Sequence, residues 1–154
     1  YLKEFNSPRP IELLFLGSKK NYTNNIGGFK INFIKRTRDE TELMFYYSGS
    51  DITIILSDQD NLPLVMQESL ACGTPVIAFR NGGMKDLITD NFNGFIVDNK
   101  NYSLFSDKII KILKLENNQK VKLRKNSRSS ITDNCDDYPI GQKTRLFYQS
   151  IIKS

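Results

Sequence analysis

The sequence predicts an α/β domain with a doubly wound, mostly parallel sheet, and three observations lead to that prediction. Short apolar runs alternate along the chain with helix-like segments, which implies parallel strands covered by helices on both faces. The run Asp51–Leu56 (DITIIL) is β-branched and nearly continuous, as in a central strand buried on both faces. The helix after it has Pro63 in its first turn and Gly73 just beyond its last turn, which are common start and stop signals.

The expected strands follow a proline-bearing linker over residues 1–10. Short apolar or alternating runs bounded by turn residues predict strands at Ile11–Gly17, Phe29–Ile34, Asp51–Leu56, Pro75–Phe79 and Asn93–Asp98. The segment Ser18–Gly28 is polar and predicts a loop. Together with the helices between them, these strands make up an expected α/β core over residues 11–98.

The expected helices lie between and after the strands. They are Asp39–Gly49, a helix from Pro63, a short one from Gly82 through Ile88, and helical sequence from Ser103 onward. The first begins with acids in its first turn and ends at a glycine, in agreement with the helix dipole. Residues 103–154 are therefore predicted to be C-terminal helices of one single domain, residues 1–154.

Composition narrows the function classes. The chain has 154 residues, a net charge of +5 and no histidine, so a zinc site has too few good ligands and a Cys–His nucleophile is excluded. No aromatic–basic alternation favours nucleic acid as a partner, and no apolar run approaches the ~20 residues of a membrane span. The positive charge fits a phosphate-bearing ligand or an anionic membrane surface, but a solvated lysine-rich surface is the favoured explanation.

Three acids, Asp58, Asp60 and Glu68, surround the start of the helix at Pro63, and three interpretations compete. In the first interpretation, Asp58 and Asp60 cap the helix N-terminus, and Glu68 is an exposed residue of its polar face. Alternatively, Asp58 and Asp60 form an Asp-x-Asp pattern that holds a divalent cation against a diphosphate. In the third interpretation, one extended ligand reaches Asp60, Glu68 and the first helix amides between them. Carboxylates suit sugar hydroxyls and amides suit phosphate, so that ligand is a nucleotide sugar.

The stretch DNLPLVMQESLACGTPVIAFRNGGMKDLITDNFNGFIVD resembles the donor-binding signature of family 4 retaining glycosyltransferases, which have the GT-B fold. That pattern has an acid, seven residues and a Glu, then a Gly-Thr-Pro-Val turn, a Gly-Gly pair and a later Asn-Gly. The preceding residues INFIKRTRDETELMFYYSGSDITIILS resemble the strand, helix and strand that come before the signature. The resemblance implies that the chain is the Rossmann-like C-terminal half of a GT-B fold, with a helical C-terminal segment.

The resemblance also implies roles for individual residues. Glu68 would bind the ribose hydroxyls and Asp60 the hydroxyls of the donor sugar, although Asp60 is one methylene shorter than the more common Glu. Lys35 and Arg36 would lie near the nucleobase, and no catalytic residue is assigned. The implied donor-binding residues, which include backbone amides and close-approach glycines, are Asp60, Asn61, Leu62, Pro63, Leu64, Glu68, Gly82 and Gly83.

The function implied is transfer of a sugar from a nucleoside-diphosphate sugar to an acceptor hydroxyl with retention, in polysaccharide, lipopolysaccharide or glycolipid synthesis, without a metal cofactor. GT-B enzymes have two such domains, so an N-terminal acceptor domain or a partner subunit is expected, and Tyr1 in place of Met suggests a fragment. The alternative is a non-catalytic nucleotide-sugar-binding module or one subunit of a split enzyme. We expect a cytoplasmic location, with peripheral contact to an anionic membrane face and no nucleic-acid partner.

Overall fold

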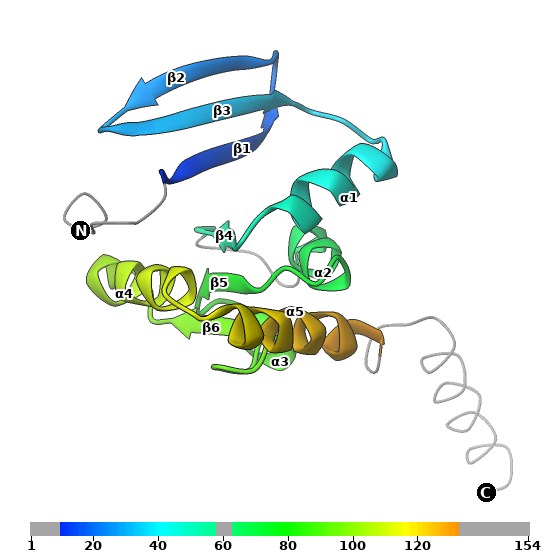
Figure 1. The fold of residues 1–154 in the computed structure, drawn as a ribbon, viewed down its shortest axis with the longest axis vertical. Helices are drawn as coiled ribbons and strands as arrows, with labels where there is room; N and C mark the ends of the chain where they lie inside the picture. Colours follow the sequence, from blue (N-terminus) through cyan, green and yellow to red (C-terminus); the bar gives the residue numbers. More distant parts are fainter. Residues whose placement is uncertain (1–9, 58–62, 133–154) are drawn as a thin grey trace, which may run out of the picture. The chain divides into compact units, whose positions relative to one another are not determined.

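The computed structural model describes residues 10–57 and 63–132 (Figure 1). Its contacts separate two units, Tyr1–Tyr46 and Tyr47–Ser154, and each contains a three-stranded sheet. Helix α1 (Glu40–Gly49) contains the boundary between them. Along the described chain, no helix is long and apolar enough to cross a lipid bilayer.

The sheet of the first unit has the order β1-β3-β2. Strand β1 (Glu12–Ser18) pairs with β3 (Phe29–Lys35) in parallel, and β2 (Tyr22–Ile26) pairs with β3 in antiparallel orientation. The strands predicted at Ile11–Gly17 and Phe29–Ile34 are therefore present, within one residue at each end.

Strand β2 corrects the prediction of a loop over Ser18–Gly28. All five of its residues are exposed, so it lacks the apolar alternation that identifies a strand in a sequence. Gly27 and Gly28 have φ angles of 62° and 87°, which suit a tight two-residue hairpin turn. Tyr22 stacks on Phe33 of the opposite strand with ring centroids 4.4 Å apart. The turn and this cross-strand pair, rather than burial, explain the strand.

The sheet of the second unit is entirely parallel, with the order β4-β5-β6. Its strands are β4 (Thr53–Ile55), β5 (Val76–Phe79) and β6 (Gly94–Val97), and every residue of β5 and β6 is buried. The helices of this unit that follow α1 are α2 (Leu64–Ala71), α3 (Met84–Leu87), α4 (Tyr102–Leu113) and α5 (Asn117–Thr132).

Helices cover both faces of this sheet, as the doubly wound prediction requires. Side chains alternate between the faces along a strand. On one face, Val76 and Ala78 of β5 belong to the same buried cluster as Met66 of α2. On the other face, the ring of Phe79 lies 4.9 Å from that of Phe105 on α4. The apolar runs of β5 and β6 thus reflect burial between two helical layers.

Strand β4 differs from its prediction. Within the described sheet it lies at one end of the strand order instead of in the centre, and it has three residues. Ile54 is 38% exposed and Leu56 is 55% exposed, so this apolar run is not buried on both faces. A β-branched run predicts a strand. Whether that strand pairs on one side or on both sides depends on the connections between strands, which the run itself does not determine.

The predicted helix starts are shifted by one or two positions, as α2 and α4 show. Pro63 has φ −65° and ψ 132° and occupies the N-cap of α2, immediately before the first turn instead of within it. Helix α4 begins at Tyr102 instead of Ser103, because the side chain of Asn101 caps it by accepting a hydrogen bond from the backbone N–H of Leu104 at 3.1 Å.

Candidate functional site

The predicted donor-binding residues divide into three groups. Asp60, Asn61 and Leu62 lie outside the described residues, as does Asp58 of the competing metal site. Pro63, Leu64 and Glu68 belong to the start and second turn of α2, and Gly82 and Gly83 follow β5. Lys35 and Arg36 lie at the end of β3 in the first unit, and both are exposed.

Glu68 is partly buried and has a defined hydrogen-bond partner. The hydroxyl of Tyr47 donates to Glu68 Oε2 at 2.9 Å. Tyr47 lies near the end of α1 and is 4% exposed. Burial, reinforced by the hydrogen bond to Glu68, raises the pKa of Tyr47 well above its ordinary value, so its hydroxyl keeps its proton and remains a donor. The Tyr47 hydroxyl thus orients the Glu68 carboxylate, which is not simply an exposed side chain on the polar face of α2.

Asparagine side chains connect the loops at the carboxyl ends of all three strands of this sheet. Asn81, after β5, donates through Nδ2 to the backbone oxygen of Ser57, after β4, at 2.7 Å. Asn99, after β6, donates through Nδ2 to Asn81 Oδ1, also at 2.7 Å. Ligands of doubly wound sheets bind at this edge, where strands end and helices begin.

The glycine pair of this edge has the backbone geometry that glycine permits. Gly82 has φ 49°, in the left-handed region, and Gly83 occupies the N-cap of α3. Because neither residue carries a side chain, the backbone at the end of β5 is open to close approach.

The turn after α2 anchors Tyr47. Gly73 has φ 74°, and a Cβ there would lie 3.2 Å from the backbone oxygen of Arg124 on α5. The hydroxyl of Thr74, which is fully buried, donates to the backbone oxygen of Tyr47 at 2.6 Å. The Gly-Thr part of the signature is therefore structural, and it fixes the backbone from which the Tyr47 side chain projects.

The Asn-Gly part of the signature is structural as well. Asn93 is fully buried; its Nδ2 donates to the Leu87 oxygen at 2.7 Å, and its Oδ1 accepts from the Thr89 N–H at 2.8 Å. A Cβ on Gly94 would lie 2.0 Å from the backbone oxygen of Val76, so β6 approaches β5 too closely for any side chain at that position.

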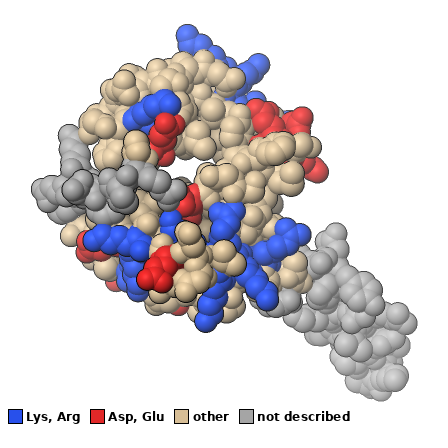
Figure 2. Space-filling view, viewed as in Figure 1, with Lys and Arg blue, Asp and Glu red and all other residues tan. Residues whose placement is uncertain are grey.

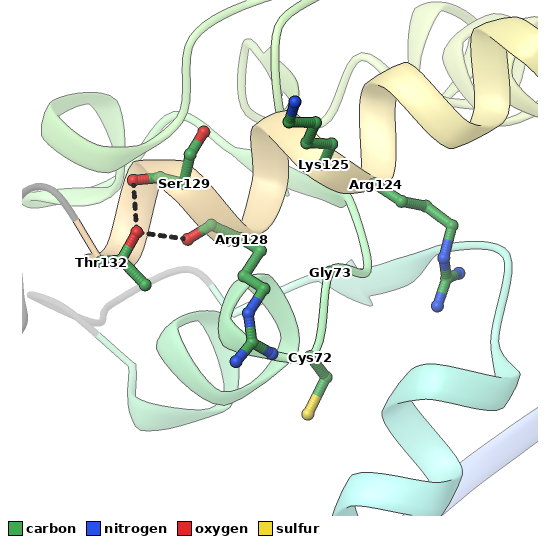
Figure 3. Close-up of a pocket in the computed structure, with 7 residues that line it drawn as sticks. All are labelled: Cys72, Gly73, Arg124, Lys125, Arg128, Ser129 and Thr132. Carbon is green, nitrogen blue, oxygen red and sulfur yellow. Dashed lines mark hydrogen bonds between the residues drawn. The ribbon is translucent and has the colours of Figure 1, made fainter.

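A shallow groove of about 370 Å³ lies at the other end of α2, against α5 (Figure 3). Its two arginines are already engaged with carbonyls at helix ends. Arg124 donates to the backbone oxygens of Ser48 and Ser50 at 2.6 and 2.9 Å, and Arg128 donates to the Ala71 oxygen at 3.0 Å. These contacts stabilise helix ends. The groove lies at the opposite end of α2 from Pro63 and is not part of the predicted donor site. It is lined by Cys72, Gly73, Arg124, Lys125, Arg128, Ser129 and Thr132.

Sequence reasoning missed Tyr47 and Asn81. Tyr47 is 21 residues from Glu68 and falls in an ordinary amphipathic segment, so no local pattern pairs the two. Asn81 stands beside the glycine pair and reads as a turn residue. In both cases the signal comes from the fold, which brings strand ends and helix ends together.

The chain is similar to a known protein family and to one of its relatives. The family model described as Glycosyl transferases group 1 matches residues 12–130. An uncharacterized glycosyltransferase from Haemophilus influenzae is 35% identical over 112 residues, which is 71% of this chain and 29% of that protein. The chain thus spans under a third of the length of this relative.

Two solved structures have a similar fold. The sucrose-phosphate synthase from Thermosynechococcus elongatus matches with a TM-score of 0.68 and 26% identity, over 80% of this chain and 31% of that one. The C-terminal domain of a glycosyl transferase group 1 family protein from Francisella tularensis matches with a TM-score of 0.60 and 25% identity, over 70% of this chain and 54% of that one.

Proposed function

We propose that this chain, which belongs to the group 1 glycosyl transferases and has their GT-B type of α/β fold, binds the sugar donor. In this proposal the donor is a nucleoside-diphosphate sugar, and the sugar passes to an acceptor hydroxyl with retention of its anomeric configuration. The acceptor would be bound by a second domain or a partner subunit, since the matched glycosyltransferases are longer than this chain.

One observation carries the donor-binding proposal: the partly buried, hydrogen-bonded carboxylate of Glu68 on the second turn of α2. That helix begins after the carboxyl end of β4, at the edge where doubly wound sheets bind ligands. Its first backbone N–H groups have no partner within the helix and suit a phosphate, whereas a carboxylate suits hydroxyl groups. This arrangement supports the assignment of the ribose to Glu68 and of the diphosphate to the helix start.

The remaining assignments rest on the resemblance to the donor-binding signature. Asp60 would accept hydrogen bonds from the donor sugar, and the backbone N–H groups of Asn61, Leu62 and Leu64 would lie along the diphosphate. Gly82 and Gly83 would let the backbone approach the donor. The chain's contribution to catalysis is then electrostatic, because helix amides stabilise the charge that develops on the departing diphosphate. We further propose a cytoplasmic location, because nucleotide-sugar donors are cytosolic.

No metal is required in this proposal. The competing Asp-x-Asp site at Asp58 and Asp60 predicts that donor affinity depends on a divalent cation. We expect that EDTA leaves the affinity for a nucleoside diphosphate unchanged. A loss of binding that Mg²⁺ or Mn²⁺ restores would favour the metal site instead.

The proposal is tested by calorimetric titration of the protein with UDP, GDP and ADP and with their glucose conjugates. Glu68→Gln should weaken binding of the free diphosphate and of the conjugate alike, by roughly tenfold or more for loss of a charged hydrogen-bond partner. Asp60→Asn should weaken binding of the conjugate alone.

Glu116→Gln provides the matched control, since it makes the same change at an exposed position before α5. It should leave every affinity unchanged. Wild-type affinity in Glu68→Gln would refute the assignment of the donor site.

A further inference from the structure

We propose that Tyr47 is a positioning residue for donor binding: its hydroxyl holds Glu68 Oε2, so that Oε1 of the same carboxylate is presented to the nucleotide. The inference rests on the proposed function of Glu68 as a donor ligand. It adds a residue that lies on a different helix, 21 positions earlier in the chain.

The contact has the geometry expected of a positioning interaction. The distance from the Tyr47 hydroxyl oxygen to Glu68 Oε2 is 2.9 Å, within the ordinary range of O–H···O hydrogen bonds. The Tyr47 ring is 4% exposed, so packing restricts it to a narrow range of orientations. A free glutamate side chain has several rotamers, and fixing one oxygen selects among them before a ligand arrives.

The backbone around Tyr47 is fixed from two directions. Its carbonyl accepts the hydrogen bond from the buried Thr74 hydroxyl at 2.6 Å. The carbonyls of Ser48 and Ser50, just after it, accept from the Arg124 guanidinium of α5. The position of the Tyr47 hydroxyl is therefore set by the turn after α2 and by α5.

The electrostatic setting keeps the hydroxyl a donor. Burial raises the pKa of Tyr47, so a neutral phenol faces the carboxylate at any pH at which the enzyme would work. A neutral donor orients Glu68 without neutralising its charge. A lysine or arginine at the same place would pair with the carboxylate and compete with the donor hydroxyls.

The test is a double-mutant cycle, measured by calorimetric titration with UDP, or with GDP or ADP if one of those binds more tightly. Tyr47→Phe keeps the buried ring and removes only the hydroxyl. It should raise Kd by about tenfold, the size expected when a hydrogen bond to a charged group is lost. In a Glu68→Gln background the same change should have little further effect, because Tyr47 acts through the Glu68 carboxylate.

Tyr46→Phe is the matched control, since Tyr46 also donates to a carboxylate, Glu42 Oε1, at 3.0 Å. It should leave Kd unchanged. Glu68→Asp is a second variant. It leaves Tyr47 unchanged, so a destabilising effect of Tyr47→Phe on folding cannot explain its result. Its shortened carboxylate should not reach both Tyr47 and the nucleotide, so its affinity should fall as far as that of Glu68→Gln.

The outcomes separate this inference from the proposed function. If Glu68→Gln weakens binding and Tyr47→Phe only lowers the melting temperature, Tyr47 is a packing residue and the inference is wrong. Equal losses from Tyr47→Phe in both backgrounds, or wild-type affinity in Glu68→Asp, would also overturn it. If Glu68→Gln itself binds as the wild type does, the proposed function fails first.

Discussion

The buried Asn93 gives a sharp test of the division between scaffold and site. Asn93→Ala removes the hydrogen bonds to the Leu87 oxygen and from the Thr89 N–H, at 2.7 and 2.8 Å. Each such bond is worth about 0.5–1.5 kcal/mol net, and the cavity left by a fully buried amide adds about 1 kcal/mol. The expected loss in the free energy of unfolding is therefore about 3 kcal/mol.

For a chain of this size, such a loss lowers Tm by about 6–12 °C. Circular dichroism melting measures the shift. Asn99→Ala is the control, because Asn99 is exposed and makes its hydrogen bond to Asn81 at the surface; its Tm should fall by about 2 °C or less. At a temperature where Asn93→Ala is folded, it should bind UDP as tightly as the wild type. A Tm shift no larger than that of the control, or a loss of UDP affinity without one, would refute the scaffold role.

Three further predictions concern titration and charge. Because burial raises the pKa of Tyr47 above 10.0 in the folded state, folding retains a proton that the unfolded chain releases. The stability advantage of the wild type over Tyr47→Phe in urea unfolding should therefore shrink between about pH 9 and 11, and an advantage that grows would contradict it. Burial also raises the pKa of Cys72 above 9.0, so in a Cys135→Ser background its alkylation by iodoacetamide should have a midpoint above that value; a lower midpoint would mean an exposed thiol. Lys and Arg side chains gather over the face on which α5 lies (Figure 2), and α5 carries no carboxylate. Replacing Lys122 and Lys125 with Gln should cut flotation with anionic vesicles about tenfold or more, and undiminished flotation would remove α5 as a membrane contact.

The sequence predicted the elements whose signal is local. Strands β5 and β6 are continuous apolar runs between turn residues, and burial between two helical layers imposes that composition. The start of α2 just after Pro63 and its end before Gly73 follow from backbone preferences of those two residues. The fold class rests on these features and was therefore predictable.

Features that depend on distant neighbours were not predictable in the same way. Strand β2 is exposed along its whole length, and its pairing with β3 comes from the glycine turn. Strand β4 lies at one edge of the described sheet. Its place in the strand order depends on the connections between strands, and the local sequence DITIIL carries no information about them. Of the candidate site, the sequence identified Glu68 by its spacing from Asp60, but the partner that orients it, Tyr47, is known only once α1 and α2 are packed.

Several residues of the signature are required by the packing and turns of the fold itself. Gly94 is needed for strand pairing, Gly73 for the close approach of α5, and Asn93 for the turn before β6. Within the described residues, the structural contact of Glu68 is the hydrogen bond from the Tyr47 hydroxyl. Partial burial of a carboxylate costs hydration free energy, and a neutral side chain of the same shape would accept the Tyr47 hydrogen bond without that cost.

In our proposal, the Glu68 charge is kept for the nucleotide ligand. Glu68→Gln should therefore unfold at a temperature equal to or above that of the wild type, because the amide oxygen still accepts from Tyr47 and the desolvation cost of the charge is gone. Its affinity for a nucleoside diphosphate should nevertheless fall. Thermal melting with and without UDP measures both quantities in one experiment. A marked decrease in Tm without ligand would mean that Glu68 stabilises the fold, and the inference from its burial to a ligand would then be wrong.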